Sequence, residues 1–82
     1  MSKLKEIVLP EELGEGTESS IVLWYKEPGD SFEEGETIVE VQTEKVAFEV
    51  AAPFSGTLKE IKVKRGESAT VGQVIAMAEP NL

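Results

Sequence analysis

The chain of 82 residues contains no cysteine and no histidine. Without cysteine it can form no disulfide bond, no thiolate metal site and no cysteine nucleophile. Without histidine it also lacks the commonest acid–base residue of enzymes, and no pair of carboxylates stands out as isolated from water. We therefore expect a protein that is not catalytic by itself and that holds no metal ion.

Positive charge and long apolar runs are also scarce. Sixteen acidic residues face eight basic ones, and a net charge of −8 opposes nucleic-acid binding, which needs basic surface. No stretch approaches the roughly 20 apolar residues of a membrane span, and residues 1–6 lack the apolar core of a signal peptide. We expect a soluble domain with no nucleic-acid or membrane partner, in the cytoplasm, or in the mitochondrial matrix if the source is eukaryotic.

What the chain does have is a lysine between two alternating apolar runs. Residues 39–43 and 46–50 each alternate with period two, which predicts two strands of an antiparallel hairpin. If Glu44 and Lys45 are the two turn residues, the apolar side chains form matching cross-strand pairs. These pairs are Val41 with Phe48 and Val39 with Val50.

The turn itself breaks the usual rule for such hairpins. Two-residue turns favour Asn-Gly, Asp-Gly or a leading Gly because they need positive φ, and Glu44-Lys45 contains none of these. Breaches of this kind tend to occur at functional or strained sites. The register also sets Glu40 opposite Glu49, and a slip of two residues remains an alternative that moves Lys45 to the edge of the turn.

An internal repeat predicts the architecture. Shifting the sequence by 37 residues places Gly29-Asp30-Ser31 over Gly66-Glu67-Ser68, Gly35 over Gly72, Ile38 over Ile75 and Ile21 over Leu58. Turn residues bound every apolar run and no helical period is present. We predict one all-β domain over residues 1–82, with its core at about 5–79. It should be a flattened eight-stranded barrel or sandwich, made of two four-stranded sheets related by pseudo-twofold symmetry.

The symmetry predicts where the lysine lies. The counterparts of the Lys45 hairpin are the residues near Val8 and the chain end near Leu82, so the termini should occupy one end of the domain and the lysine the other. Pro53 should stop the central strand and form the bridge between the halves.

Several motifs recur in the order and spacing of one known family. They are Leu9-Pro10, Gly14-Glu15-Gly16, Trp24, Gly29-Asp30, Glu34-Gly35-Glu36, Thr43-Glu44-Lys45-Val46, Phe48-Glu49-Val50, Pro53 and Gly56. Over about residues 7–78, the chain resembles the lipoyl domain of the dihydrolipoamide acyltransferase component of 2-oxo acid dehydrogenase complexes, in the biotinyl/lipoyl-attachment family. The commonest triplet in that family is Asp-Lys-Ala, where this chain has Glu-Lys-Val.

The resemblance implies a flattened eight-stranded β-barrel that carries lipoic acid in amide linkage on Lys45. Glu44 and Val46 would be recognised by the lipoate-protein ligase or lipoyl transferase. The arm would pass an acyl group from a 2-oxo acid decarboxylase to the acyltransferase catalytic domain, and dihydrolipoamide dehydrogenase would reoxidise it. The resemblance also implies a loop beside the hairpin that partner enzymes inspect: Glu11, Glu12, Leu13, Gly14, Glu15, Gly16 and Thr17.

Other interpretations stay open. A biotinyl carrier domain has the same fold and a lysine on the same hairpin, but that family typically flanks the lysine with methionine. An unmodified scaffold module is possible because fold does not fix function. Trp24 and Phe48 are more typical of core or cross-strand packing than of a ligand platform. Residues 33–36 are more typical of a solvated acidic turn than of a metal site, because the regularly spaced Asp and Asn ligands of a calcium loop are missing.

Overall fold

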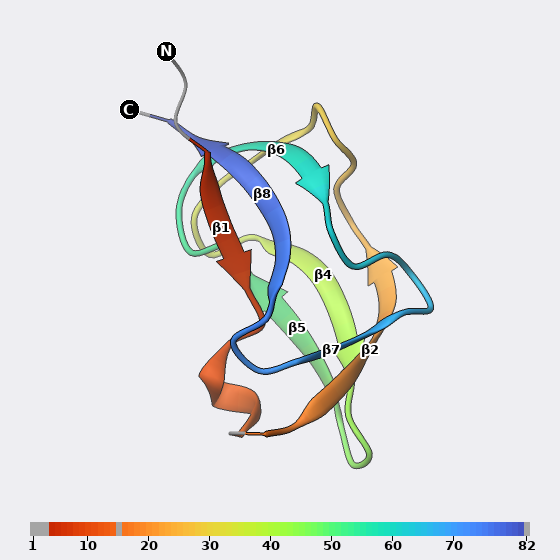
Figure 1. The fold of residues 1–82 in the computed structure, drawn as a ribbon. Helices are drawn as coiled ribbons and strands as arrows, with labels where there is room; N and C mark the ends of the chain where they lie inside the picture. Colours follow the sequence, from red (N-terminus) through yellow and green to blue (C-terminus); the bar gives the residue numbers. More distant parts are fainter. Residues whose placement is uncertain (1–3, 15, 82) are drawn as a thin grey trace.

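The computed structural model describes residues 4–14 and 16–81, and Figure 1 shows their arrangement. Alternating apolar positions form strands, and glycine, proline and acidic residues form the turns between them. The elements in chain order are β1 (Lys5–Val8), the 3₁₀ helix η1 (Glu11–Leu13), β2 (Glu18–Trp24), β3 (Ser31–Phe32), β4 (Thr37–Gln42), β5 (Ala47–Ala51), β6 (Gly56–Ile61), β7 (Ser68–Thr70) and β8 (Val74–Pro80). The predicted all-β class with eight strands is confirmed.

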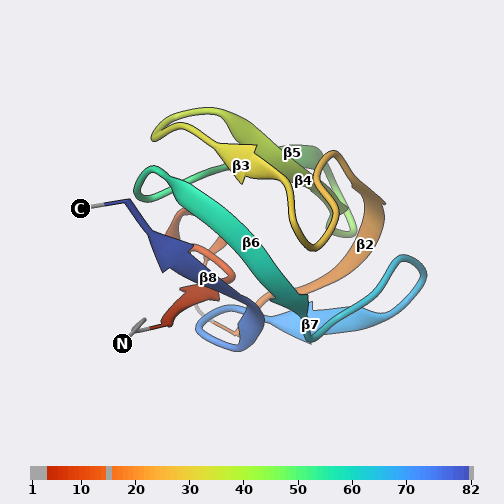
Figure 2. The ribbon, with the colours of Figure 1, turned by 90° about the horizontal axis from the view of Figure 1, so that it is seen from above.

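The strands form two antiparallel sheets of four, in the orders β1-β8-β6-β3 and β5-β4-β2-β7. Each sheet takes its short edge strand from the other half of the sequence, since β3 pairs with β6 and β7 pairs with β2. Figure 2 shows the two sheets facing each other. The sequence repeat alone did not predict this exchange of β3 and β7.

The repeat is reproduced in the details of strand pairing. The register of β2 on β4 shifts between Ile21 and Leu23, and that of β6 on β8 shifts between Leu58 and Glu60, which is the same place 37 residues on. Such bulges increase the local twist of a strand and help a sheet to close on itself. The pseudo-twofold symmetry therefore extends to the irregularities.

The turns of the two halves share one chemistry. In the turn that begins at Glu27, the Asp30 N–H donates to the Glu27 carbonyl at 2.9 Å, and the Asp30 carboxylate accepts from the Glu27 N–H at 2.9 Å. The intervening Gly29 has φ of 101°, the positive value that a type II turn requires at this position. Its counterpart at Lys64 and Glu67 has the same pair of bonds.

The core lies between the sheets and is almost entirely aliphatic. Its largest fully buried apolar side chains are Ile7, Leu9, Ile38, Leu58, Ile75, Val39 and Val41. Trp24 is half-buried against this core and donates its indole N–H to the Val63 carbonyl at 3.0 Å, while Phe48 is also half-buried. The prediction that both aromatics pack structurally is confirmed.

The molecule is elongated, with extents of 39 × 20 × 20 Å. Figure 1 shows the β4–β5 hairpin at one end and the ends of the described chain at the other, as the symmetry predicted. Val8 pairs with Val74 at the start of β8, and not at the end of β8 that corresponds to the hairpin, so the prediction that residues near Val8 are the counterpart of the hairpin is wrong. The strand β5 ends at Ala51, ahead of Pro53, as predicted.

One pair of equivalent positions differs between the halves. A Cβ built on Gly56 would collide with the backbone carbonyl oxygen of Glu79 on the neighbouring strand β8. At the equivalent position of the first half, β2 accommodates Ser19, which is buried with no hydrogen-bond partner for its hydroxyl among the described residues. At this position β2 therefore leaves room for a side chain, whereas β6 and β8 approach each other too closely for one.

This asymmetry predicts opposite effects of two small substitutions. Gly56→Ala should lower the free energy of unfolding by about 1–3 kcal/mol, because the added methyl forces β6 and β8 apart. Ser19→Ala should leave that free energy unchanged or raise it, since it removes an unpaired buried hydroxyl. Urea unfolding of the two variants measures both effects, and a Gly56→Ala protein as stable as the parent would contradict the predicted close approach.

Within residues 4–14 and 16–81, no helix is long and apolar enough to cross a membrane.

Candidate functional site

The lysine hairpin has the predicted register. Gln42 pairs with Ala47, and the two apolar pairs form as predicted, which leaves Glu44 and Lys45 in the turn. The Thr43 N–H donates to the Val46 carbonyl at 2.9 Å and closes the turn. The alternative slip of two residues is therefore wrong. The cross-strand pair of Glu40 and Glu49 is present although it sets two negative charges opposite each other.

Thr43 explains how the turn forms without glycine. No non-glycine residue in the described ranges has positive φ, so the turn is not one of the types that need Asn-Gly. Instead the Thr43 Oγ1 accepts from the backbone N–H groups of Lys45, at 3.2 Å, and Val46, at 3.1 Å. A hydroxyl that bonds the backbone two and three residues on is a recognised turn device. The sequence analysis missed this role of Thr43.

The Thr43 hydroxyl should therefore hold the turn rigid. In Thr43→Val both N–H groups lose this acceptor, and we expect backbone order parameters of residues 44–46 to fall from about 0.85 towards 0.6. The free energy of unfolding should drop by about 0.5–1.5 kcal/mol. Nitrogen-15 relaxation of the variant tests this, with Thr43→Ser as the control because serine keeps the oxygen. Equal rigidity in the valine and serine variants would show that the hydroxyl is dispensable.

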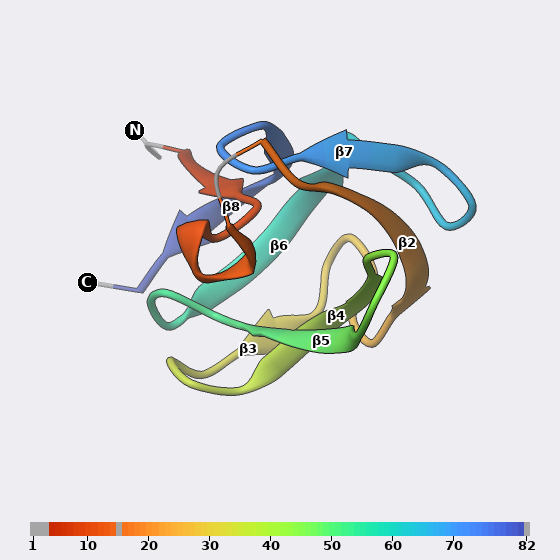
Figure 3. The same cartoon turned by 90° about the horizontal axis from the view of Figure 1, so that it is seen from below.

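A second segment, the η1 segment of residues 11–14 and 16–17, lies beside the hairpin. It follows β1 and Pro10 and begins with the 3₁₀ helix η1, after which the Gly14 N–H donates to the Glu11 carbonyl at 2.9 Å. The chain then returns towards β2, and the Thr17 hydroxyl donates to the Leu13 carbonyl at 3.0 Å. Figure 3, seen from the hairpin end, shows this segment and the β4–β5 turn at the same end of the molecule.

A groove of about 630 Å³ separates the hairpin from this segment. Leu13 and Thr17 contribute to one wall, and Thr43 and Val46 to the other. The full lining is Leu13, Gly16, Thr17, Glu18, Thr43, Glu44, Lys45 and Val46. Of the loop singled out from the sequence, Leu13, Gly16 and Thr17 line this groove. The sequence analysis did not predict the helical turn within that loop.

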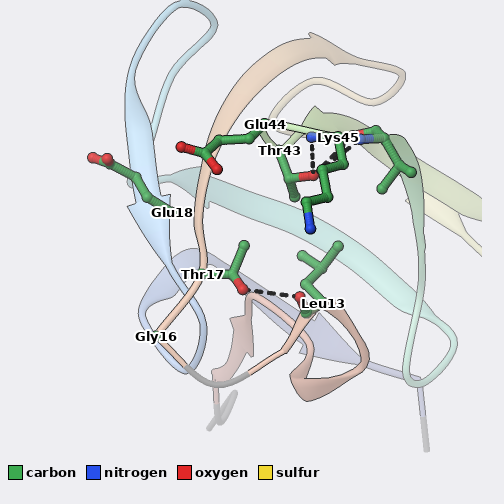
Figure 4. Close-up of a pocket in the computed structure, with 8 residues that line it drawn as sticks. Leu13, Gly16, Thr17, Glu18, Thr43, Glu44 and Lys45 are labelled. Carbon is green, nitrogen blue, oxygen red and sulfur yellow. Dashed lines mark hydrogen bonds between the residues drawn. The ribbon is translucent and has the colours of Figure 1, made fainter.

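Figure 4 shows the Lys45 side chain directed from the hairpin towards Leu13 and Thr17, at the mouth of this groove. Lys45 is exposed. Three other lysines are engaged in ion pairs: Lys26 with Glu36 at 2.8 Å, Lys59 with Glu79 at 3.7 Å and Lys62 with Glu60 at 3.2 Å. No ion pair of Lys45 occurs among the described residues, so its amine is presented to solvent.

The other residues singled out from the sequence surround this lysine. Glu44 is exposed in the turn, and Val46 is 55% exposed, a high value for a large apolar side chain. Glu11 and Glu12 are exposed on η1, whereas Leu13 is half-buried and packs against the core. Gly14, Gly16 and Thr17 follow along the same segment, and Glu15 lies outside the described residues.

The surface around the groove is acidic. Glu18, at the start of β2, and Glu44 both line it, and both also line a second, smaller groove of about 390 Å³. In Figure 4 their carboxylates project away from Lys45. The sequence analysis did not identify Glu18, because only the pairing of β2 with β4 brings it close to the hairpin.

Displaced pKa values occur away from the groove. A hydrogen bond to Glu40 raises the pKa of Tyr25, and the Lys26 ammonium lowers the pKa of Glu36. No group of three or more potential metal-ligand side chains occurs in the described part of the chain. What the site offers is an exposed primary amine on a braced turn.

Comparisons with known proteins agree with this geometry. The sequence model of the biotin/lipoyl family, described as "Biotin-requiring enzyme", matches residues 5–77. The chain is 40% identical over 74 residues to the dihydrolipoyllysine-residue succinyltransferase component of the 2-oxoglutarate dehydrogenase complex of Staphylococcus saprophyticus. It is 44% identical over 71 residues to the dihydrolipoyllysine-residue acetyltransferase component of the pyruvate dehydrogenase complex of Staphylococcus aureus.

These matches cover 90% and 85% of this chain but 18% and 16% of the relatives, so the chain spans less than a fifth of their length. Among solved structures, the chain resembles the lipoyl domain of the 2-oxoglutarate dehydrogenase complex from Azotobacter vinelandii. The TM-score is 0.61, the identity is 29%, and the match covers 95% of both chains.

The chain belongs to the biotin/lipoyl family, whose model matches nearly all of it. Within that family it is a lipoyl domain, a carrier that is not catalytic by itself. The predicted family and the flattened eight-stranded fold are both confirmed.

Proposed function

We propose that lipoic acid is attached in amide linkage to Nζ of Lys45, and that the domain carries acyl groups on this arm within a 2-oxo acid dehydrogenase complex. The observation that carries the proposal is the position of Lys45. It is an exposed residue of the two-residue turn between β4 and β5, in a chain whose family match covers residues 5–77.

The residues present fit such a group. Amide formation needs a primary amine that a ligase can reach, and Lys45 supplies one at the end of an elongated molecule. The ligase must remove the proton of this amine before Nζ attacks the activated carboxyl carbon of lipoate. An amide then forms and the activating group leaves with the bonding electrons. Because the carboxylates of Glu18 and Glu44 project away from Lys45 in Figure 4, we assign the deprotonation to the ligase.

The chain itself contributes position. When bound, lipoic acid supplies a dithiolane that accepts an acyl group and two electrons. Thr43 keeps the anchor turn in one shape, and β4 and β5 place that turn at one end of the domain. A rigid, protruding anchor lets one arm visit several catalytic sites, and tethering makes each visit effectively intramolecular.

The proposed partners follow from the relatives, which are components of 2-oxo acid dehydrogenase complexes. We assign the chain four: a lipoate-protein ligase or lipoyl transferase, a 2-oxo acid decarboxylase, an acyltransferase catalytic domain and dihydrolipoamide dehydrogenase. Residues 1–82 would form a single lipoyl domain of the acyltransferase component, with the cytoplasm, or a mitochondrial matrix, as its location. The two relatives belong to different complexes, and acylation rates with the two kinds of decarboxylase would identify the particular 2-oxo acid.

The direct experiment is to incubate the chain with lipoate, ATP and a lipoate-protein ligase and to record the intact mass. The expected result is the addition of one lipoyl group per chain. The same incubation with biotin and a biotin ligase serves as the matched control and should add nothing. A chain that gains biotin but no lipoyl group would overturn the proposal in favour of the biotinyl carrier.

Flanking residues should decide between these two ligases. Glu44 and Val46 are both exposed beside Lys45, so a ligase can contact them directly. Replacing both by methionine reproduces the flanks typical of biotinyl domains. Because one or two contacts can discriminate substrates about 10- to 200-fold, we expect detectable biotinylation and a drop in lipoylation. Competition between the ligases measures the ratio, and an unchanged ratio would place selectivity elsewhere, first in the segment from Glu11 to Thr17.

A further inference from the structure

The two grooves beside the hairpin differ in their aliphatic lining and in size. The groove between the hairpin and the η1 segment has two aliphatic residues, Leu13 and Val46, on facing walls. The rest of its lining is Gly16, Thr17, Thr43, Lys45 and the acidic Glu18 and Glu44. The second groove has Val22 as its one aliphatic residue, and the rest of its lining consists of serine, glutamine, threonine and glutamate. The first, at about 630 Å³, is also the larger, and it falls within the usual size range of small-molecule sites, about 300–1,000 Å³.

The anchor of the arm is itself part of the first groove. Lys45 belongs to the lining of this groove and is absent from the lining of the second. Figure 4 shows its side chain directed towards Leu13 and Thr17, and Glu18 and Glu44 directed the other way. A group joined to Nζ therefore begins its path between Leu13 and Thr17.

We propose that this groove is a docking site for the lipoyl arm of the same chain, which lies folded against Leu13 and Val46 between transfers. The inference rests on the proposed attachment to Lys45. Amide formation removes the lysine charge and adds an aliphatic chain with a dithiolane ring, which gains by leaving water for an apolar surface. Because the arm is tethered at the groove, its effective concentration there is in the millimolar range, so even weak docking is well populated.

Docking also accounts for the exposure of Val46. A large apolar side chain that is 55% exposed beside the half-buried Leu13 leaves apolar surface uncovered across the groove. A folded arm covers both side chains without a second protein. The domain would then exist in two states, with the arm docked or extended, and a partner that contacts the η1 segment would shift the balance towards the extended state.

The test uses the chain loaded with an unlabelled lipoyl group, after intact mass has confirmed the loading. With the protein labelled in carbon-13 and nitrogen-15, isotope-filtered NMR should show contacts from the dithiolane ring protons to the methyl groups of Leu13 and Val46. Contacts to the Lys45 methylenes alone, or to Val22 in the second groove, would overturn the docking site. Failure to load at all would instead contradict the proposed function.

A pair of variants gives an independent readout. Leu13→Ser removes the apolar wall, and Val22→Ser makes the same change in the second groove. If the docked ring is protected, reduction of the loaded group by dithiothreitol should be about two- to fivefold faster in Leu13→Ser than in the parent, with Val22→Ser unchanged. Thermal melts check that both variants are folded. Equal reduction rates in all three folded proteins would overturn the proposal.

Discussion

Lys45→Arg should gain no lipoyl mass, while its fold and stability stay those of the parent. Arginine keeps the positive charge and the long side chain, but its guanidinium cannot form the amide that an ε-amine forms. Lys45 is exposed and makes no ion pair among the described residues, and exposed substitutions of this kind move the free energy of unfolding by about 0.5 kcal/mol or less. Intact mass after incubation with ligase, lipoate and ATP measures the modification, and urea unfolding measures the stability.

The matched control is Lys64→Arg, which changes another exposed lysine in a tight turn. Lys64 begins the Lys64–Glu67 turn, which has a glycine with positive φ at its third position, and it lies outside the groove lining. This variant should be lipoylated as fully as the parent. Lipoylation of Lys45→Arg, or its loss in Lys64→Arg, would show that the site of attachment has been assigned to the wrong residue.

The second large effect concerns the partner decarboxylase. The lipoyl group on the domain should be a better acyl acceptor than free lipoamide by a factor on the order of a hundred, because the decarboxylase also contacts the protein surface. The surface beside the hairpin is the η1 segment, where Glu11 and Glu12 are exposed. Reductive acylation rates with pyruvate and with 2-oxoglutarate decarboxylase components measure the effect and identify the 2-oxo acid.

Two double variants that each remove two negative charges provide the control for this prediction. Glu11→Gln with Glu12→Gln should slow acylation and flatten its dependence on salt, because complementary charges steer association and are screened as salt rises. Glu33→Gln with Glu34→Gln makes the same charge change in an exposed turn at the opposite end of β4, and it should leave the rate near that of the parent. Equal effects of the two pairs would mean that net charge alone, and not a recognised segment, steers the partner.

The hairpin could be predicted well from sequence because its two strands alternate strictly. A one-residue slip would have turned Val39 and Val41 away from the core, and burial of both residues excludes it. The 37-residue repeat likewise predicted the number of strands and the position of the lysine opposite the termini. These features depend on local periodicity and on turn residues, which can be recognised in the sequence alone.

Other features depend on contacts between distant segments. The sequence shows β3 and β7 as short runs after a glycine turn, but no local sequence pattern indicates that each joins the sheet of the opposite half. The groove needs η1, β2 and the hairpin to converge, and Glu18 reaches it only through strand pairing. Thr43 could have been found, since a threonine ahead of a turn that lacks glycine is a known way to satisfy backbone N–H groups.

The central claim is that Lys45 carries a lipoyl group that takes up acyl groups. Its most direct measurement is peptide mapping by mass spectrometry of the loaded chain after incubation with a decarboxylase component and its 2-oxo acid. The account predicts that the peptide containing Lys45 alone carries the lipoyl mass, and that part of it also carries the acyl mass. A Lys45 peptide without lipoyl mass, or lipoyl and acyl groups on another lysine, would contradict it.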